Sequence, residues 1–250
     1  MQKRRQHITE LINREGQITF SRLKSAFPDL SEMTLRTDLK CLDEIGAIIR
    51  IHGGAKSIET VAGTDGFLAQ RTIRNHDLKI QIAQKAAALI RGQSSVFLDS
   101  GSTTTTLSKY IPDGPRQIFT SGLSCAMELA ALNDATVHVI GGTLNKYSQS
   151  MAGSRSVLEL QSYHFDICFI GVTSFSPEIG FCCEASDDCE LKKTAMKQSS
   201  YVVALMDSSK FGMVNTNRIC PADGVDAVIT DSGLTSEQRQ YFEHCGVAVI

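Results

Sequence analysis

Hydroxyl groups and glycines are concentrated in one short stretch of the chain, "LDSGSTTTTL", residues 98–107. An apolar run ends there at Asp99, and Gly101 leads into serine and threonine residues that open a helical pattern. Loops of this composition turn backbone N–H groups toward phosphate, and the first turn of a helix favours anions. The stretch therefore predicts contact with a phosphorylated small molecule, which the protein either holds or converts.

Other polar loops follow apolar runs further along the chain. Because ligands bind beyond the carboxyl ends of the strands in a parallel sheet, we expect these loops to meet at one edge. Lys210, in "MDSSKFG", supplies a cation for phosphate, and Asp99 accepts hydrogen bonds from sugar hydroxyls. The candidate residues are Asp99, Gly101, Ser102, Thr103, Thr104, Thr120, Ser121, Gly122, Gly141, Gly142, Asp207, Ser208, Ser209, Lys210 and Gly212. Each alone is also explained by an ordinary helix cap or a solvated lysine, so it is their convergence that favours a site.

Apolar runs and helical patterns alternate through residues 68–250. A long helical pattern covers residues 68–90, and five shorter ones lie between most of the later runs. The runs are "SSVFLD", "RQIFTS", "ATVHVIGG", "FDICFIGV", "YVVALMD", "DAVITD" and the terminal "VAVI". Near-continuous apolar strands that alternate with helices predict an α/β domain with a mostly parallel, doubly wound sheet, covered on both faces.

The first 57 residues differ from the rest in charge. They hold ten lysines and arginines against seven aspartates and glutamates, a net charge of +3, which leaves −5 for the remainder of a chain of net charge −2. A small basic part joined to an acidic body indicates two different partners.

Three helical patterns and a hairpin fit into this basic part. In the third pattern Ser31 is a suitable N-cap, and Leu35, Leu39 and Leu42 form an apolar stripe. The run "AIIRIHGGA" that follows predicts a β-hairpin. Together these elements predict a winged helix-turn-helix that reads double-stranded DNA, and a three-helix bundle used only for dimerisation is the alternative. The candidate DNA-binding residues are Thr34, Arg36, Thr37 and Lys40 on the third helix and Arg50 and His52 on the wing.

The composition is that of an ordinary globular protein, with 42% hydrophobic and 21% charged residues. No apolar run approaches the roughly 20 residues that cross a bilayer, and the basic N-terminus lacks the apolar stretch of a secretory signal. We therefore expect a cytoplasmic protein with no membrane partner. The predicted domains are a DNA-binding domain at 1–57, a linker at 58–67, and an effector-binding and oligomerisation domain at 68–250.

The chain contains eight cysteines, most of them in apolar surroundings. Cys182, Cys183 and Cys189 cluster in "CCEASDDC", which is not a usual zinc spacing, and we expect neither a metal nor a cofactor. Buried, reduced thiols are the favoured interpretation, and a redox sensor is the alternative.

The segment "SEMTLRTDLKCLDEIGAIIRIHGGA" resembles the signature of DeoR-family bacterial transcriptional regulators. The shared features are a Ser-x-x-Thr-hydrophobic-Arg-x-Asp-Leu recognition helix, a Leu-(Asp/Glu)-x-x-Gly ending and an Arg-x-His-Gly-Gly-Ala wing. One departure is Thr37, which stands where the family usually has a second basic residue. The resemblance thus implies one phosphate or base contact fewer, and a different operator preference.

The resemblance continues through "DSGSTT", "TSGLS", "GGTLNKYSQSMAG", "FDICFIGVTS" and "DSSKFG". These match in order the landmarks of the family's sensor domain, which is similar to ribose-5-phosphate isomerase in fold and binds phosphorylated sugars. The resemblance implies that the effector pocket is lined by Asp99, Gly101, Ser102, Thr103, Ser121, Gly122 and Lys210. It also puts Glu190 and Lys193 near the pocket or a subunit contact. The family's usual "TNS" reads "TSG" here, which implies a different ligand.

Two functions remain for the acidic body. It is either a sugar-phosphate isomerase, in which Glu190 or Asp99 moves a proton between adjacent carbons, or a switch that controls the DNA-binding part. An isomerase has no need of a winged helix, which favours the switch and a protein that is not an enzyme. We therefore expect a homo-oligomeric repressor of a carbohydrate-utilisation operon, a dimer or tetramer, released by a phosphorylated sugar.

Overall fold

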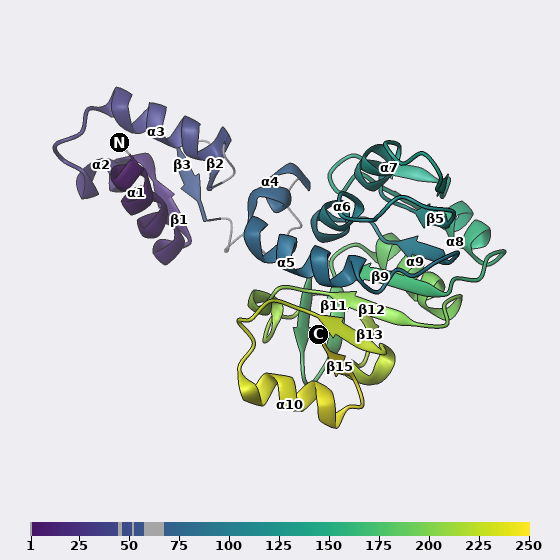
Figure 1. Cartoon of the computed structure of the whole chain (residues 1–250). Coiled ribbons are helices and arrows are strands. Elements are labelled where there is room, and N and C mark those ends of the chain that lie inside the picture. Colours follow the sequence, from purple (N-terminus) through teal and green to yellow (C-terminus); the bar gives the residue numbers. More distant parts are fainter. Residues whose placement is uncertain (1, 45–46, 52, 58–67) are drawn as a thin grey trace. The chain divides into compact units, whose positions relative to one another are not determined.

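The chain forms two compact units, Met1–Arg74 and Asn75–Ile250, in a computed structural model (Figure 1). The structure describes residues 2–44, 47–51, 53–57 and 68–250. The linker predicted at 58–67 lies outside the described residues. Helix α4 (Leu68–Ile73) groups with the first unit, although the sequence prediction began the second domain at residue 68.

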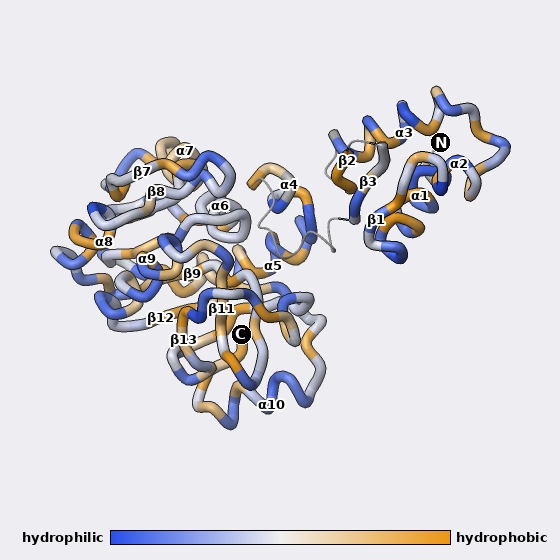
Figure 2. Tube along the Cα trace, turned by 180° about the vertical axis from the view of Figure 1, so that it is seen from behind, coloured by the Kyte–Doolittle hydropathy of each residue, from blue (hydrophilic) through white to orange (hydrophobic). Residues whose placement is uncertain are grey.

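Three helices with apolar stripes form the core of the first unit, as predicted. They are α1 (Gln2–Glu15), α2 (Phe20–Ala26) and α3 (Glu32–Glu44). Ile8, Leu23 and Leu35, one from each helix, are fully buried against one another's helices in a single apolar cluster. The hydroxyl of Ser31 accepts a 3.1 Å hydrogen bond from the backbone N–H of Thr34, which is the predicted N-cap of α3. In Figure 2 these helices alternate orange and blue, as amphipathic helices do.

A three-stranded sheet completes the winged helix-turn-helix. The predicted hairpin is present as β2 (Ile49–Ile51) and β3 (Gly54–Lys56). A further strand that the sequence did not predict, β1 (Gln17–Thr19), pairs antiparallel with β3. Gly54 allows this pairing, because a Cβ at its position would collide with the backbone carbonyl oxygen of Ile18.

A seven-stranded sheet forms the centre of the second unit, and all its described strand pairs are parallel. Its strand order is β15-β14-β12-β9-β4-β5-β6. The strands are β4 (Ser95–Leu98), β5 (Gln117–Thr120), β6 (Thr136–Val139), β9 (Ile167–Gly171), β12 (Val202–Leu205), β14 (Ala227–Ile229) and β15 (Ala248–Val249). Each of the seven predicted apolar runs contains one of these strands.

Helices cover both faces of this sheet, which confirms the doubly wound α/β architecture. Val96 and Leu98 of β4 pack with α5 (His76–Ala87), α6 (Ser102–Ser108) and α7 (Leu123–Leu129). Phe97, between them, points to the other face, whose cluster includes residues of the other three helices. Those helices are α8 (Ser154–Leu160), α9 (Ser186–Lys197) and α10 (Ser236–His244).

Two small antiparallel elements extend the unit beyond what the sequence predicted. A hairpin of β7 (Thr143–Asn145) and β8 (Ser150–Ala152) follows β6. A second small sheet has the order β10-β11-β13, formed by β10 (Ser174–Ser176), β11 (Gly180–Cys183) and β13 (Asn217–Cys220). Short one-turn helices, η1 (Ser208–Lys210) and η2 (Ala222–Gly224), lie on either side of β13 in the chain.

The predicted helical pattern over residues 68–90 is not one helix. It divides into α4 and α5 at Asn75, which has left-handed backbone angles of φ 52° and ψ 37°. Asparagine adopts this conformation more readily than most residues, and it interrupts the helical path although the apolar periodicity continues. The asparagine side chain then bonds to the carboxylate of Asp207 at 3.2 Å.

Candidate functional site

The carboxyl ends of the parallel strands gather most of the predicted binding residues at one edge of the sheet. Asp99 directly follows β4, and Ser121 directly follows the neighbouring β5. The backbone N–H of Asp99 continues the ladder by donating to the carbonyl of Phe169 in β9 at 3.0 Å. Strand pairing therefore brings the two predicted loops together, as the sequence indicated.

Asp99 is the most deeply held polar group at this edge, with 1% of its surface exposed. Its Oδ2 accepts a 2.9 Å hydrogen bond from the backbone N–H of Gly171 and a second from the ammonium group of Lys192. Among the described residues nothing donates to its buried Oδ1. The hydroxyl of Ser121 is likewise buried and has no partner among the residues that the structure describes.

Burial and charge act against each other on this pair. Burial raises the pKa of Asp99, and the nearby Lys192 ammonium and the Gly171 N–H reduce that shift without cancelling it. For Lys192, burial lowers the pKa, but Asp99, Cys183 and Asp188 together raise it to about 12. The lysine is therefore held protonated next to the carboxyl group of Asp99, whose Oδ1 accepts no hydrogen bond from the described residues.

Lys192 was missed by sequence reasoning, which named its neighbours Glu190 and Lys193 instead. Those two side chains pair with each other at 2.9 Å on the outer side of α9, where Glu190 is 65% exposed. A usable signal was present, since Lys192 lies three residues from both Cys189 and Ala195, on the buried stripe of the helix. A lysine on the buried stripe of a helix calls for an acid partner.

The hydroxyl-rich loop is tied mostly into its own helix. Thr104 and Thr105 both donate to the carbonyl of Gly101, at 3.0 and 2.7 Å, and Thr105 also bonds to Ser124 of α7 at 2.7 Å. Ser102 is buried and Thr103 half-buried. The loop is thus a rigid wall at this edge.

The remaining predicted residues lie at the same edge but on other strands. Gly122 is the N-cap of α7 after β5, and Gly142 follows β6. Lys210 lies in η1 after β12, which is two strands from β4 in the sheet order. That segment is fixed by Asp231, which accepts from the backbone N–H and the hydroxyl of Ser208 at 2.7 and 2.9 Å.

A cavity of 470 Å³ adjoins this edge between the β7–β8 hairpin and the start of α9. Its wall carries Asn145, Asn217 and the carboxylates of Glu184, Asp187 and Asp188. The hydroxyl of Ser150 bonds to Asp188 at 2.9 Å, and the backbone N–H of Met151 donates to the carbonyl of Ser121 at 2.7 Å. The hairpin therefore links the acidic cavity to the Ser121 loop.

In the first unit the exposed face of α3 carries the predicted DNA-binding side chains. Arg36, Thr37 and Lys40 are exposed, and so is Met33, which the sequence interpretation did not name. The guanidinium of Arg36 lies 4.3 Å from the centroid of the Phe20 ring and 3.8 Å from Glu32. Thr34 is half-buried in the first turn of α3, and its hydroxyl bonds to that of the N-cap residue Ser31 at 2.9 Å.

The wing and the N-terminus complete this face in part. Arg50 on β2 is exposed, and its backbone N–H donates to Asp43 at 2.9 Å. His52, predicted on the wing, lies outside the described residues. Arg4 and Arg5 of the basic N-terminus pair at 2.6 and 2.8 Å with Asp38, which is 1% exposed. The aspartate of the recognition-helix signature thus fastens α3 to α1.

Comparison with protein families identifies both units. Residues 4–61 match the DeoR-like helix-turn-helix domain, and residues 74–232 match the DeoR C-terminal sensor domain. The chain belongs to the DeoR family. This DeoR-family protein is accordingly a DNA-binding transcriptional regulator, as its signature residues had indicated.

Curated relatives match the DeoR-family chain over almost its whole length. It is 32% identical over 248 residues to the HTH-type transcriptional regulator GolR of Listeria innocua, covering 99% of this chain and 97% of the relative. It is 28% identical to a putative aga operon transcriptional repressor of Escherichia coli O157:H7, with 99% and 93% covered. GlpR of Haloferax volcanii is 29% identical over 88% of this chain and 86% of its own length.

Solved structures resemble this DeoR-family protein more distantly. Ribose 5-phosphate isomerase A of Methanocaldococcus jannaschii aligns over 55% of each chain, with 17% identity and a TM-score of 0.39. The eIF2B beta subunit of Chaetomium thermophilum covers 71% of this chain and 54% of its own length, with 14% identity and a TM-score of 0.46.

The cysteines of the DeoR-family protein are free, and the described residues contain no cluster suited to a metal ion. Cys182, Cys183 and Cys189 are no more than 2% exposed. Burial raises the pKa of the Cys182 and Cys183 thiols, which lowers their reactivity. No helix in the described part of the chain is long and apolar enough to cross a membrane.

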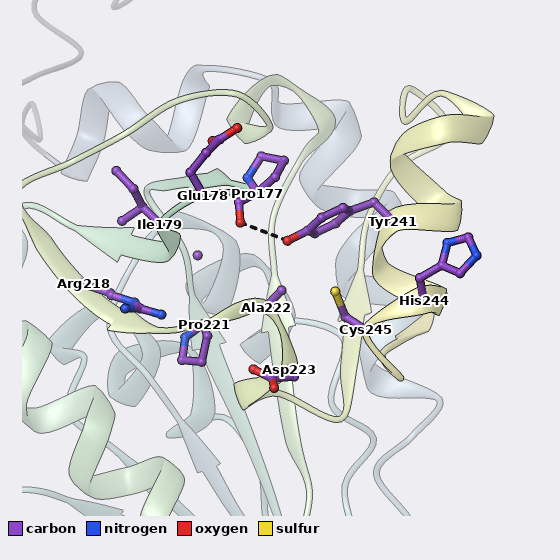
Figure 3. Close-up of a pocket in the computed structure, with 11 residues that line it drawn as sticks. Pro177, Glu178, Ile179, Arg218, Pro221, Ala222, Asp223, Tyr241, His244 and Cys245 are labelled. Atoms are coloured by element: carbon purple, nitrogen blue, oxygen red, sulfur yellow. Dashed lines mark hydrogen bonds between the residues drawn. The ribbon is translucent and has the colours of Figure 1, made fainter.

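A separate cavity of 370 Å³ lies between the β10–β11 turn and α10 (Figure 3). The Tyr241 hydroxyl closes one side by donating to the carbonyl of Pro177 at 3.0 Å. Arg218, Asp223 and the sulfur of Cys245 also line it. It lies on the small sheet and is lined by none of the residues at the Asp99 edge.

Proposed function

We propose that the protein is a repressor of a carbohydrate-utilisation operon, and that a phosphorylated sugar bound in the second unit controls its affinity for operator DNA. The observation that carries the ligand part is the pair of buried polar atoms, Asp99 Oδ1 and Ser121 Oγ, for which the described residues supply no partner. Buried polar groups are nearly always hydrogen-bonded, so a ligand with hydroxyl groups completes the edge. The name of the relative in Escherichia coli O157:H7, a putative aga operon transcriptional repressor, supports the regulatory part.

In this proposal the sugar end and the phosphate end of the ligand bind to different residues. Sugar hydroxyls donate to Asp99 and bond to Ser121, whereas the phosphate needs a cation other than Lys192, whose charge Asp99 already balances. Lys210 supplies that charge, and backbone N–H groups of the hydroxyl-rich loop add hydrogen bonds. The proposed effector-binding residues are Asp99, Gly101, Ser102, Thr103, Thr104, Ser121, Gly122, Gly142, Lys192 and Lys210. Glu190, which is exposed, is assigned to a subunit contact instead.

In the first unit we propose that α3 enters the major groove. Arg36, Thr37, Lys40 and Thr34 face the bases and nearby phosphates, and Arg50 and His52 hold phosphates from the wing. The cation–π contact with Phe20 and the ion pair with Glu32 orient the Arg36 guanidinium before DNA arrives. That preorganisation favours Arg36 as the main contact to a base edge.

A homo-oligomer, dimer or tetramer, is part of the proposal. Two copies present two recognition helices to half-sites about 34–36 Å apart on the operator. Leu123 and Met127 on α7 and Leu144 and Tyr147 on the adjacent hairpin are exposed large apolar side chains, and such groups mark contact surfaces. A second copy of this chain is the proposed partner of that surface, and light scattering of Met127→Glu against the wild type tests it by the loss of the larger species.

Control by the effector requires that the ligand binds two arrangements of the oligomer with different affinity. Typical coupling free energies of about 1–3 kcal/mol change operator affinity about 5–150-fold. The sign proposed here is release of DNA on binding of the sugar phosphate.

The ligand part is tested by a thermal-shift and calorimetry screen of pentose and hexose phosphates, run together with a turnover assay for aldose–ketose interconversion. A ligand at 100 times its Kd raises the free energy of unfolding by about 2.7 kcal/mol. Lys210→Ala should abolish this gain, and Lys109→Ala, an exposed lysine paired with Glu128, should keep it. Turnover of any sugar phosphate would instead support the isomerase alternative.

The DNA part is tested on a duplex that the wild-type protein selects from random sequences. Arg36→Ala should weaken binding of that duplex by about 1–3 kcal/mol, because it removes a base contact. Arg14→Ala, which removes an exposed arginine at the end of α1, is the matched control. Equal affinity of the Arg36→Ala and wild-type proteins would exclude α3 from recognition.

A further inference from the structure

A cavity of 600 Å³ lies at the opposite, amino-terminal edge of the seven-stranded sheet. Its wall comes from residues just before or at the start of β4, β5, β6 and β9, four strands that are neighbours in the sheet. Backbone hydrogen bonds hold these segments side by side: Gln117 donates to Ser94 at 3.1 Å, and Thr136 to Arg116 at 2.9 Å. The wall is therefore as rigid as the sheet itself, and it lies a strand's length, about 13 Å, from the Asp99 edge.

Arg116 is the one arginine or lysine among the residues that line this cavity, which also include His164, and its hydrogen bonding is incomplete. Among the described residues its Nε and Nη1 have no acceptor, although both atoms are buried. The hydroxyl of Ser94, on the same wall, is also buried without a partner in the part of the chain that the structure describes. Unsatisfied buried donors are costly and rare, and three of them from two side chains of one cavity wall point to a missing acceptor.

Two carboxylates at this end of the sheet, Asp166 on the cavity wall and Asp113 beside it, accept hydrogen bonds from other donors, and the second acid of the wall, Asp134, is exposed. Asp166 accepts from the backbone N–H and the hydroxyl of Ser95 at 2.8 and 2.9 Å, which lowers its pKa. Asp113 accepts from the backbone N–H groups of Asn133, Asp134 and Gly114, which lower its pKa to about 2. Asp166 and Asp113 are therefore ionised but directed at neutral donors.

The backbone leaves room for the guanidinium at this position. Gly114 has φ +151°, and a Cβ there would lie 2.9 Å from Nη2 of Arg116. Any other residue at 114 would press on the arginine side chain. The glycine thus lets the chain pass the guanidinium closely at the side of the cavity.

We infer that this cavity is a second small-molecule site, which binds a hydrophilic metabolite carrying an oxyanion, a phosphate or carboxylate, through Arg116 and Ser94. Apart from Pro115, every lining residue is polar or charged, so the wall suits a ligand with hydroxyl groups and excludes an apolar one. The volume lies within the range of small-molecule pockets. The fork of donors on arginine matches the oxygens of phosphate and carboxylate, and the side chain turns about its own torsions to present the covered nitrogens.

This site does not depend on the effector proposed for the Asp99 edge. Its ligand is a second small molecule to which the regulator responds, and it binds at the amino-terminal ends of the same strands whose carboxyl ends form the Asp99 edge. The two sites are separable because no residue lines both.

The test follows the Arg116 Nε–Hε cross-peak in NMR spectra of the full-length ¹⁵N-labelled protein. The peak is identified by its absence from Arg116→Lys. Glucose 6-phosphate and gluconate are the phosphate and carboxylate probes, and glucose is the uncharged control. We expect one of the acid probes to shift this peak at up to millimolar concentration, and glucose to leave it in place. If neither acid probe shifts it, the inference is wrong.

Variants separate this site from the effector site. Arg116→Gln should weaken binding of the active probe at this site at least about tenfold, whereas Arg155→Gln, an exposed arginine on α8, should not. In Asp99→Asn the Arg116 peak should still shift, so that failure of the proposed effector site leaves this result intact. Loss of the shift in Asp99→Asn with native spectra would contradict a separate site.

The stability of the ligand-free protein shows whether Arg116 has a structural role instead of a binding role. Arg116→Met removes two buried nitrogens that have no acceptor among the described residues, so its unfolding midpoint should equal or exceed that of the wild type. A lower midpoint would show that the guanidinium already stabilises the free fold and would overturn the inference. If Arg116→Gln does not fold, Ser94→Ala gives the binding comparison in its place.

Discussion

Lys192 on α9 donates a hydrogen bond to Oδ2 of Asp99 at the end of β4, and the two side chains are 5% and 1% exposed. The pair joins elements 93 residues apart in the chain. It therefore does two things at once: it fixes the helix above the strand ends, and it leaves Oδ1 of the carboxylate turned to a place where no described group donates. A structural ion pair and a ligand acceptor share one aspartate.

The first prediction concerns the stability of this pair. Lys192→Met leaves a buried carboxylate without its cation, and Asp99→Asn leaves a buried ammonium without its anion. Each single change should lower the free energy of unfolding by about 3–5 kcal/mol. The double variant Asp99→Asn/Lys192→Met should recover part of that loss, since no unpaired charge remains. Urea denaturation of the three proteins measures the coupling.

Lys193→Met is the control for this cycle, because Lys193 forms only a surface pair with Glu190. Its effect should stay within about 0.5 kcal/mol. Additive losses in the double variant would mean that Asp99 and Lys192 do not interact.

The second prediction concerns the acid stability of the first unit. Burial raises the pKa of Asp38, but the hydrogen bonds from Arg4 and Arg5 outweigh burial and hold that pKa below its ordinary value. Because the folded state binds the proton less readily than the unfolded state, the stabilisation is present above pH of about 4 and disappears as the pH falls through the folded pKa. The protection of the α3 amides against hydrogen exchange, corrected for the intrinsic exchange rate at each pH, should therefore fall below pH 4 in the wild type.

Asp38→Asn isolates that effect. It should destabilise α3 by about 1–3 kcal/mol at neutral pH, and the difference from the wild type should shrink as the pH falls below 4. A difference that stays constant with pH would show that ionisation of Asp38 is not its source.

Much of the second unit was predictable because the inner strands of its sheet are buried on both faces. Such strands appear as continuous apolar runs, and each run was found. The short antiparallel strands were missed because three or four residues carry little periodicity and their partners are distant in sequence, as for β11 and β13. The break at Asn75 was missed because the apolar spacing continues through it.

For the candidate effector site, the sequence could predict only those neighbours that follow adjacent strands of the sheet. Asp99 and Ser121 follow adjacent strands and were expected to be neighbours. Lys192 reaches Asp99 from a helix that crosses the strand ends, and that crossing depends on tertiary packing. Similarly, Arg4 and Arg5 pair with Asp38, a contact between α1 and α3 that also depends on tertiary packing.

The third prediction compares two adjacent glycines of the wing. A Cβ on Gly54 would collide with the backbone oxygen of Ile18, so Gly54→Ala should separate β1 from β3 and cost about 1–3 kcal/mol. At Gly53 the space is open and only the φ of +76° is strained, which costs about 1–2 kcal/mol in alanine. Exchange of the β1 and β3 amides should therefore accelerate in Gly54→Ala far more than in Gly53→Ala. Equal behaviour of the two variants would contradict the close approach of β1 to Gly54.

The last prediction decides between buried thiols and a redox sensor. Alkylation of the folded protein with iodoacetamide, followed by peptide mass mapping over time, should modify Cys41 and Cys245 first, since both are partly exposed and Cys245 lines the cavity in Figure 3. Cys220 should react more slowly, because burial raises its pKa to about 12 and leaves little thiolate. Cys182, Cys183 and Cys189 should react only at the rate of unfolding, and all eight cysteines should react in denaturant. Rapid modification of any of the three clustered thiols in the folded protein would instead support redox sensing at that cluster.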